Sequence, residues 1–282
     1  MSKILWISDY SVKQNKGGAQ QTNSEMIKAG RKLGHTIRLV TYDSVMPSAD
    51  SYDLIVINNI TKFDKGLIDD LVASGKCVRY EHDHWVAENY PELYKKVNKT
   101  IFLSPLHKES IEDKIGYKVK NYEIIPSPID SKVFKISEDS KEANSVIIVG
   151  NLCEDKGLVN LLEYARENPQ LKFYAVGWGS GVEELKTLEN IEYIGELDRK
   201  DLIKYYQRCE YFYHRPVWKE PFGRTVIEAY LCGCSLLVNS NVGAVSWDWD
   251  YSNYNKIKKN VQSQSNFWKV LEDEIQSSGD LE

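Results

Sequence analysis

Residues 216–234 read PVWKEPFGRTVIEAYLCGC, and this stretch decides how the rest of the chain is interpreted. The apolar run 211–213 precedes it, and a second apolar run at 235–238 follows it. Short apolar runs bounded by Pro and Gly are typical of strands, whereas the middle of the stretch has helical periodicity. The stretch therefore predicts the order strand, loop, helix, strand.

Two glutamates frame the predicted loop and helix. Pro221 and Gly223 oppose helix formation before about Arg224, so Glu220 is expected in the loop and Glu228 about one turn into the helix. A helix N-terminus offers unpaired backbone N–H groups and a partial positive charge, which suit a phosphate. Two carboxylate acceptors beside such donors suit a polyol attached to phosphate. A nucleotide sugar is a ligand of this kind.

This segment resembles the signature of retaining GT-B glycosyltransferases of the family 4 group, in which seven residues separate two glutamates. Other landmarks of that family occur in its order: GG at 17–18, GNL at 150–152 with EDKG at 154–157, VGWG at 176–179 and YIGE at 193–196. Several motifs in one order are far more specific than any single motif. The resemblance covers most of the chain and is closest over residues 145–245.

The length of 282 residues favours two domains, because single cores stop growing near ~250 to 300 residues. Strand-like runs alternate with helical patterns over residues 1–135, and a second alternation begins after the polar segment 136–144. Such alternation predicts parallel, doubly wound sheets. We therefore expect an α/β protein of GT-B architecture, with two Rossmann-like domains whose sheets face a central cleft.

The expected boundaries follow from these patterns and from the resemblance. Residues 1–135 form the acceptor-side domain, residues 136–144 a linker, and residues 145–250 the nucleotide-sugar-binding domain. Residues 251–282 form a C-terminal segment. Its helix, expected at 266–275, packs back on the first domain in the resembled family.

The composition limits which cellular locations and which binding partners are expected. The net charge is −5, with 20 Lys and Arg against 17 Asp and Glu in residues 1–135. This mildly basic half fits either an ordinary solvated face or peripheral contact with a membrane or an anionic acceptor, and no nucleic acid is expected. The five cysteines are scattered without metal-site spacing, and no apolar run approaches the ~18 residues of a membrane span. A soluble, cytoplasmic enzyme with free thiols is expected.

The resemblance implies three site residues in the first half. Gly17 and Gly18 follow the first strand, and their backbone is expected to approach the donor phosphate or the acceptor. His82 ends a strand at the carboxyl edge where open sheets place ligands, and it is expected to contact the donor sugar. His84 is the alternative for that role, and Asp83 is a candidate base on the acceptor side.

Lys156 is the cation that the resemblance assigns to the diphosphate leaving group. The family's usual arginine before it is replaced here by Asn151, which removes one cationic contact. Either Lys156 and helix dipoles suffice, or Arg224 or Arg215 substitutes, or the activity is low.

The remaining expected donor contacts lie in the second half. Gly177 belongs to a turn after a strand; its GxGxG spacing differs from the GxGxxG of dinucleotide sites, so NAD is not expected. Glu196 lies in the loop that faces the nucleotide base in the resembled family. Backbone N–H groups of the segment Phe222, Gly223 and Arg224 are expected to stabilise the leaving group. By resemblance, Glu220 binds sugar hydroxyls as a catalytic residue and Glu228 binds the ribose.

These expectations define a retaining hexosyltransferase that moves a sugar from a nucleotide-diphosphate donor to a glycan, a lipid-linked molecule or another hydroxyl acceptor. Neither metal nor cofactor is expected, since the nucleotide sugar is a co-substrate. Two alternatives stay open: an epimerase acting on nucleotide sugars with the same fold, and a nucleotide-sugar or glycan binding protein with impaired catalysis. The sequence does not specify the base, the sugar, the acceptor or the oligomeric state.

Overall fold

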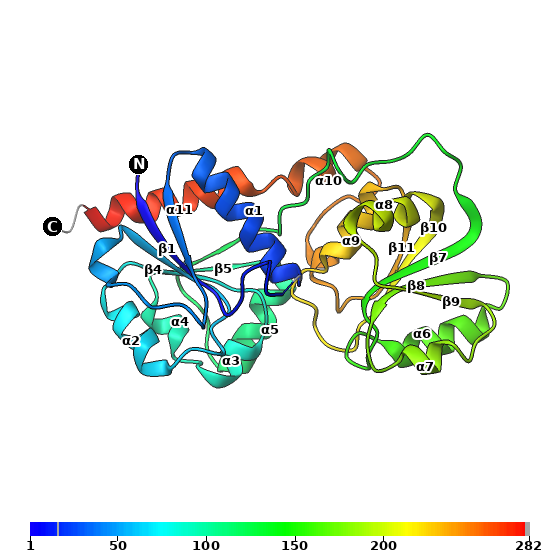
Figure 1. The fold of residues 1–282 in the computed structure, drawn as a ribbon, viewed down its shortest axis with the longest axis horizontal. Coiled ribbons are helices and arrows are strands. Elements are labelled where there is room, and N and C mark those ends of the chain that lie inside the picture. Colours follow the sequence, from blue (N-terminus) through cyan, green and yellow to red (C-terminus); the bar gives the residue numbers. More distant parts are fainter. Residues whose placement is uncertain (16, 280–282) are drawn as a thin grey trace. The chain divides into compact units, whose positions relative to one another are not determined.

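The computed structural model describes residues 1–15 and 17–279, and these residues form two compact units (Figure 1). The first unit comprises Met1–Pro128 together with Gln262–Glu282, of which the last three residues lie outside the described part. The second unit comprises Ile129–Val261. Each unit is an α/β structure with its own parallel sheet.

The first unit has a six-stranded parallel sheet with the order β2-β1-β3-β4-β5-β6. Its strands are β1 Lys3–Ile7, β2 Thr36–Val40, β3 Leu54–Ile57, β4 Cys77–Tyr80, β5 Lys99–Phe102 and β6 Tyr122–Ile124. Strands β3 and β4 are apolar at nearly every position and completely buried, as expected for a parallel sheet covered on both faces. The predicted strand, helix alternation is confirmed here.

Helices cover both faces of this sheet (Figure 1). They are α1 Gly18–Lys32, α2 Lys65–Ala73, α3 Trp85–Asn89, α4 Leu93–Lys96, α5 Pro105–Ile115 and α11 Gln264–Gly279, with a 3-10 turn η1 Ala49–Ser51. Local signals set several starts: the Asp64 side chain caps α2, and Ser104 caps α5 just before Pro105. Helix α1 begins at Gly18, although its first turns bury the polar Gln20 and Thr22 and so lack apolar periodicity.

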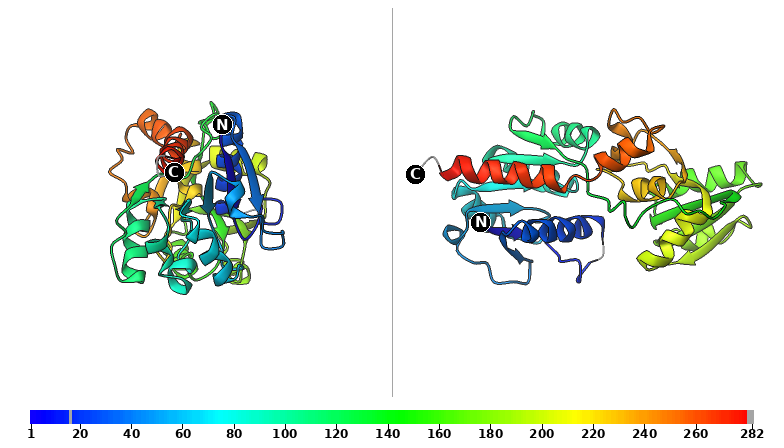
Figure 2. Two further views of the ribbon diagram at one scale, coloured as in Figure 1. Left: turned by 90° about the vertical axis from the view of Figure 1, so that its left-hand side faces the viewer. Right: turned by 90° about the horizontal axis from the view of Figure 1, so that it is seen from above.

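Helix α11 packs within the first unit, alongside α1 (Figure 2). The buried indole of Trp268 donates from Nε1 to the Met26 carbonyl at 3.0 Å. A Cβ added at Gly30 would lie 2.0 Å from the Trp268 ring, so only glycine allows this approach. The C-terminal helix is thus part of the first unit.

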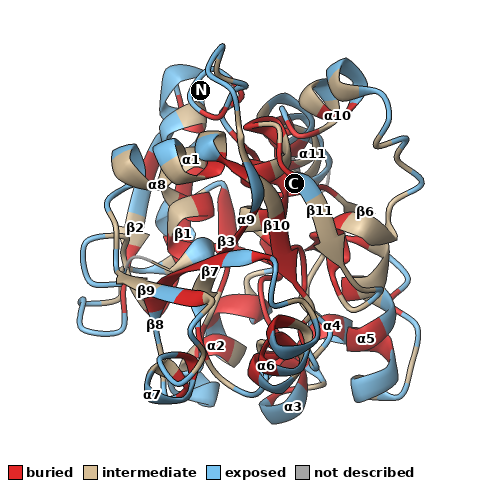
Figure 3. Cartoon of the chain, turned by 90° about the vertical axis from the view of Figure 1, so that its right-hand side faces the viewer, coloured by how far each residue is buried: buried red, intermediate tan, exposed pale blue. Residues whose placement is uncertain are grey.

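The second unit has a five-stranded parallel sheet with the order β11-β10-β7-β8-β9, and helices cover both of its faces (Figure 1). Its strands are β7 Glu142–Asn151, β8 Lys172–Trp178, β9 Ile191–Gly195, β10 Cys209–His214 and β11 Ser235–Val238. Its helices are α6 Leu158–Glu167, α7 Val182–Leu185, α8 Arg199–Arg208, α9 Arg224–Leu231 and α10 Tyr254–Asn260, with a 3-10 turn η2 Gly243–Ser246. The C-terminal half of β10, residues 212–214, is buried (Figure 3).

The unit boundaries differ from the expected ones. The second unit begins at Ile129, before the expected linker at 136–144, and it continues to Val261. The Ile129 N–H donates to the Val261 carbonyl at 3.0 Å, and the buried ring of Phe134 lies tilted against the Tyr206 ring, with 6.4 Å between the ring centroids. These contacts tie residues 129–134 to the second unit, so the unit boundary lies before the polar segment 136–144 that was expected as the linker.

Lys141 joins the ends of two helices in the second unit. Its Nζ donates to four backbone carbonyls near the C-termini of α8 and α9: Tyr206 at 3.1 Å, Gln207 at 3.2 Å, Cys209 at 2.8 Å and Cys232 at 3.3 Å. Helix C-termini carry unpaired carbonyls and a partial negative charge, so an ammonium there is doubly favourable.

We expect Lys141→Met to lower the free energy of unfolding by about 2 to 3 kcal/mol, the range for losing hydrogen bonds to a charged group. Urea unfolding measures the change, and the exposed Lys132→Met is the matched control, expected within about 0.5 kcal/mol of the wild type. Equal stability of the two variants would show that the Lys141 hydrogen bonds to the helix ends do not stabilise the protein.

Candidate functional site

The loop before α9 has the shape that its Pro and Gly predict. Gly223 is the N-cap residue of α9 with φ 83°, a left-handed conformation that favours glycine, and the helix begins at Arg224. Glu220 therefore lies in the loop, and Glu228 lies one turn into the helix, as predicted. Phe222, the residue before Gly223, is buried, with 2% of its surface exposed.

Backbone bonds hold the loop before α9 on two sides. The N–H groups of Val217 and Trp218 both donate to the Asp155 carbonyl, at 3.0 and 3.3 Å. On the other side, the Glu220 N–H donates to the Asn241 carbonyl at 2.7 Å, and the Gly243 N–H returns a bond to the Glu220 carbonyl at 2.9 Å. The loop is thus fixed between the segments that follow β7 and β11.

The Glu220 carboxylate is the centre of a polar cluster. Its Oε2 forms an ion pair with Lys156, accepts from Trp218 Nε1 at 3.1 Å and lies 3.7 Å from His214 Nε2. The Lys156 ammonium also lies 4.5 Å from the centre of the Trp218 ring. Burial by itself raises the pKa of Glu220, but Lys156 and His214 outweigh burial and hold the pKa well below its usual range. The carboxyl is therefore ionised at neutral pH.

Glu228 has a different cationic neighbour. Its Oε1 lies 3.6 Å from Arg224 Nη2, one turn back on α9, and both side chains are largely buried. Each predicted glutamate is thus held by its own cation, Glu220 by Lys156 and Glu228 by Arg224. Of the two proposed substitutes for the family arginine, Arg224 is already engaged with Glu228, while the Arg215 guanidinium lies 4.9 Å from the Tyr164 ring centre.

Lys156 is positioned by a tight turn between β7 and α6. Gly157, the N-cap residue of α6, has φ 86°, and a Cβ there would lie 2.0 Å from the Arg215 carbonyl oxygen. Asn160 on α6 donates to the same carbonyl at 3.0 Å. The glycine lets the Lys156 turn approach the segment after β10, which brings Lys156 to Glu220 across 64 residues of sequence.

The other predicted donor contacts of the second unit lie at the strand ends. Asn151 ends β7 and pairs in register with Trp178 of β8. Gly177 has φ 132°, and a Cβ there would lie 1.9 Å from the Gly150 carbonyl oxygen, so close approach of the two strand ends requires glycine. Glu196 is exposed in the loop after β9. None of these three residues joins the Glu220 cluster.

The first unit carries the remaining predicted residues at the carboxyl ends of its strands. Gly17 is the N-cap residue of α1, and Gly18 is its first residue. His82 follows β4 and is largely buried, with its ring edge-on to Tyr80 at 4.4 Å between centroids. The alternative, His84, is buried against Ser110 at 2.7 Å.

Asp83 stands between the two histidines and is also buried. Its Oδ1 accepts from the Trp85 N–H at 2.9 Å. Burial, reinforced by the Glu81 carboxylate, raises the pKa of Asp83 to about 7. A carboxyl that titrates near neutral pH fits the expected role of a base on the acceptor side.

A buried ion pair supports this edge of the first sheet. Arg79 and Glu81 both have 0% exposed side chains, and two nitrogens of Arg79 donate to the two oxygens of Glu81 at 3.0 and 2.6 Å. Glu81 also accepts from the His82 N–H at 3.1 Å and from the Tyr94 hydroxyl. The pair therefore fixes the backbone from which His82 and Asp83 extend.

Sequence reasoning missed two members of the Glu220 cluster, His214 and Trp218. His214 is the last residue of β10, at the same carboxyl edge as the other candidates, and Trp218 lies two residues before Glu220. Their position at a strand end and in the site loop was the signal that could have identified them.

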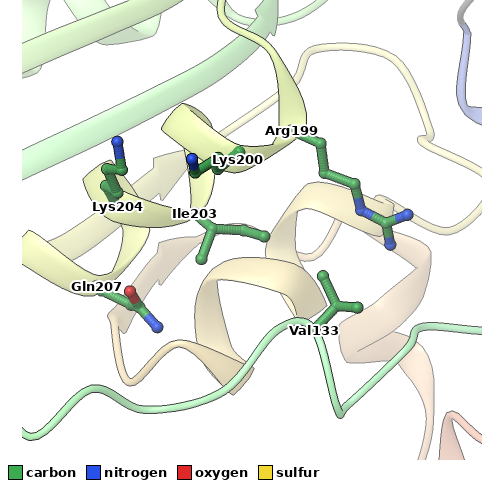
Figure 4. Close-up of a pocket in the computed structure, with 6 residues that line it drawn as sticks. All are labelled: Val133, Arg199, Lys200, Ile203, Lys204 and Gln207. Atoms are coloured by element: carbon green, nitrogen blue, oxygen red, sulfur yellow. The ribbon is translucent and has the colours of Figure 1, made fainter.

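A separate pocket of about 420 Å³ lies along α8 (Figure 4). Its walls are Val133, Arg199, Lys200, Ile203, Lys204 and Gln207. The Gln207 amide is already bonded to the Lys135 carbonyl at 2.9 Å, and the Arg199 guanidinium lies 4.9 Å from the Phe134 ring centre. None of the predicted site residues lines this pocket.

Two parallel sheets, each covered by helices on both faces, define the GT-B class of glycosyltransferase folds, and solved structures of this kind align with the whole chain. HepE from Anabaena, in complex with UDP and glucose, has a TM-score of 0.69 at 16% identity and covers 100% of this chain and 99% of its own. Sucrose-phosphate synthase from Thermosynechococcus elongatus has a TM-score of 0.69 at 16% identity, covering 98% and 94%. AviGT4, a glycosyltransferase involved in avilamycin A biosynthesis, has a TM-score of 0.69 at 12% identity, covering 98% and 99%.

Within that class, residues 130–246 match the family model described as Glycosyl transferases group 1. A search of curated proteins found no match. The family match and the fold together support a glycosyltransferase. Among residues 1–15 and 17–279, no helix has the length and apolar character needed to cross a membrane.

Proposed function

We propose that the protein is a retaining glycosyltransferase that moves a hexose from a nucleotide-diphosphate donor to an acceptor hydroxyl. The observation that carries the proposal is the pairing of Lys156 with Glu220, and of Arg224 with Glu228, at the N-terminus of one helix in a domain that matches the group 1 family model. Cations, helix N–H groups and carboxylates at one place match the phosphate and the hydroxyls of a nucleotide sugar.

The chemical step needs stabilisation of an anionic leaving group. The bond from the sugar C1 to the diphosphate oxygen breaks, the acceptor oxygen bonds to C1 from the same face, and the departing phosphate takes the acceptor proton. Lys156 and the N–H groups of Phe222, Gly223 and Arg224 stabilise the charge that develops on the diphosphate. This route needs no dedicated nucleophile, so Glu220 positions the sugar through its hydroxyls.

The other residues bind the donor in this proposal. Glu228 accepts from the ribose hydroxyls, and the backbone around Gly177 and Asn151 accommodates the diphosphate. Glu196 lies in the loop assigned to the base. For His82, a contact with the sugar stays a prediction, as does approach of the Gly17 and Gly18 backbone to the phosphate or the acceptor.

A UDP-sugar is the first donor to test, because HepE, which shares the fold, has been solved with UDP and with UDP-glucose. For the acceptor we propose a glycan or a lipid-linked hydroxyl, with peripheral membrane contact through the mildly basic residues 1–135. The five cysteines are free, which supports a reducing, cytoplasmic location. That the reaction needs no metal stays a prediction, and transfer in the presence of EDTA tests it.

A panel of UDP-, GDP- and ADP-sugars in a thermal-shift assay is the direct test, since a ligand that binds the native state raises Tm. We expect one nucleotide to stabilise the protein and Glu228→Ala to weaken its binding about tenfold or more by calorimetry, because the ribose loses its carboxylate acceptor. The exposed Glu163→Ala on α6 is the matched control. Unchanged affinity in Glu228→Ala would count against the proposal.

Asn151 gives a specific reason to keep a second candidate, a binding protein with impaired catalysis, because one cation of the resembled family is absent there. The donor selected by the panel separates the candidates when it is incubated with and without acceptors. Transfer or slow donor hydrolysis above the level of a Lys156→Ala variant identifies an enzyme, and an isomerised nucleotide sugar identifies an epimerase.

A further inference from the structure

The two oxygens of the Glu220 carboxylate are in different situations. Oε2 forms an ion pair with Lys156 and accepts a hydrogen bond from the Trp218 indole N–H at 3.1 Å. His214 Nε2 lies 3.7 Å from the same oxygen. Within the part of the chain that the structure describes, Oε1 accepts no hydrogen bond. One edge of the carboxylate is therefore anchored, and the other is available to accept a hydroxyl.

Trp218 contacts both charges of the Glu220–Lys156 pair. Its N–H bonds the carboxylate, and its ring face lies 4.5 Å from the Lys156 ammonium. Its own position is fixed, because its backbone N–H donates to the Asp155 carbonyl and Asn241 Nδ2 donates to the adjoining Val217 carbonyl at 3.1 Å. The indole thus contacts both the carboxylate and the cation from a loop held by backbone hydrogen bonds.

If the proposed function holds, binding of the donor breaks the ion pair between Lys156 and Glu220. Lys156 must turn toward the diphosphate, and Glu220 then loses its nearest counter-ion while a sugar hydroxyl arrives. A carboxylate held only by Lys156 would be free to follow the ammonium or to rotate. A neutral donor on a fixed loop stays in place during this change.

We propose that Trp218 is a positioning residue that holds Glu220 by Oε2 when Lys156 engages the diphosphate, leaving Oε1 for a hydroxyl of the donor sugar. His214, at the end of β10, supports the same oxygen from the strand side. This inference rests on the proposed function and adds a determinant of sugar recognition, distinct from recognition of the nucleotide. Its consequence is that Trp218 affects binding of the sugar but not of the nucleoside diphosphate.

The test compares Trp218→Phe with the wild type by calorimetry with UDP and with UDP-glucose, and by the kcat of transfer or donor hydrolysis. Phenylalanine keeps an aromatic face for Lys156 but lacks the N–H. We expect UDP affinity within about twofold of the wild type, and a fall of about tenfold in the affinity for UDP-glucose relative to UDP and in kcat, as for one lost bond to a charged acceptor. Trp249→Phe, whose indole stacks on Trp247 at 5.1 Å, is the matched control.

A double variant distinguishes a positioning effect of Trp218 on Glu220 from a general effect on folding. In a Glu220→Gln background, Trp218→Phe is expected to have little further effect on the ratio of the two affinities, because the anchored charge is already absent. The role of Trp218 would be overturned, while the proposed function stands, if Trp218→Phe lost affinity for UDP and UDP-glucose equally. The same conclusion would follow if its affinities and kcat equalled those of Trp249→Phe. If wild-type protein binds neither UDP nor UDP-glucose, both the inference and the UDP-sugar proposal are wrong.

Discussion

Lys156→Met is expected to lower kcat for glycosyl transfer by about 10²- to 10³-fold, the usual effect of removing one charge-stabilising donor from an active site. Lys156 is the cation nearest Glu220, and Asn151 occupies the position of the cation that the resembled family adds. The unliganded protein is also affected, because burial then raises the pKa of a carboxyl that Lys156 had held low.

The pH dependence of the Lys156→Met variant has a defined sign. In the wild type the folded pKa of Glu220 is depressed, so its stabilising contribution is present above its unfolded pKa of roughly 4.3 and is lost only as pH falls through the lower folded pKa. In the variant that loss is expected at higher pH. Kinetics and thermal unfolding between about pH 4 and 8 measure both effects. Lys219→Met, an exposed lysine of the same loop, is the control, and a kcat within tenfold of the wild type for Lys156→Met would exclude the assigned role.

Arg79→Met is expected to lower the free energy of unfolding by about 3 to 5 kcal/mol, which is a large part of the ~5 to 15 kcal/mol of a typical domain. The variant leaves the Glu81 carboxylate with 0% exposure and without its cation. Two carbonyls at the end of β3, those of Ile57 and Asn58, also lose the donor that Arg79 supplies. The edge that carries His82 and Asp83 therefore loses its support.

The double variant Arg79→Met/Glu81→Met shows whether the buried charge is the cause. Removing both charges is expected to destabilise the protein less than the sum of the two single changes, because no isolated carboxylate remains. Urea unfolding followed by circular dichroism gives the values, and the exposed Arg38→Met in β2 is the control, expected within about 1 kcal/mol of the wild type. Additive losses from the two single variants would show that the pair contributes through packing alone.

Local sequence signals predicted most of the fold. Strands at 54–57 and 77–80 and helices at 65–73 and 158–167 begin and end where apolar periodicity, Pro and capping residues place them. Pro91 is a weaker signal, because the chain forms two short helices, α3 and α4, on either side of it rather than one helix that begins there. Each of these signals acts between residues a few positions apart, so a single sequence contains it in full.

What the sequence determined by itself is the succession of strands and helices, the start of α9 at Arg224, and the placement of Glu220 in the loop before it. Only the tertiary structure decided that Lys156 forms an ion pair with Glu220 and that Trp218 and His214 contact the same carboxylate. It also decided that Lys141 donates hydrogen bonds to carbonyls near the C-termini of α8 and α9. The physical reason is that these contacts depend on the order of strands in the sheet. Strand β7 lies beside β10, although 57 residues separate Asn151 from Cys209 in the chain, and no local propensity specifies that neighbour.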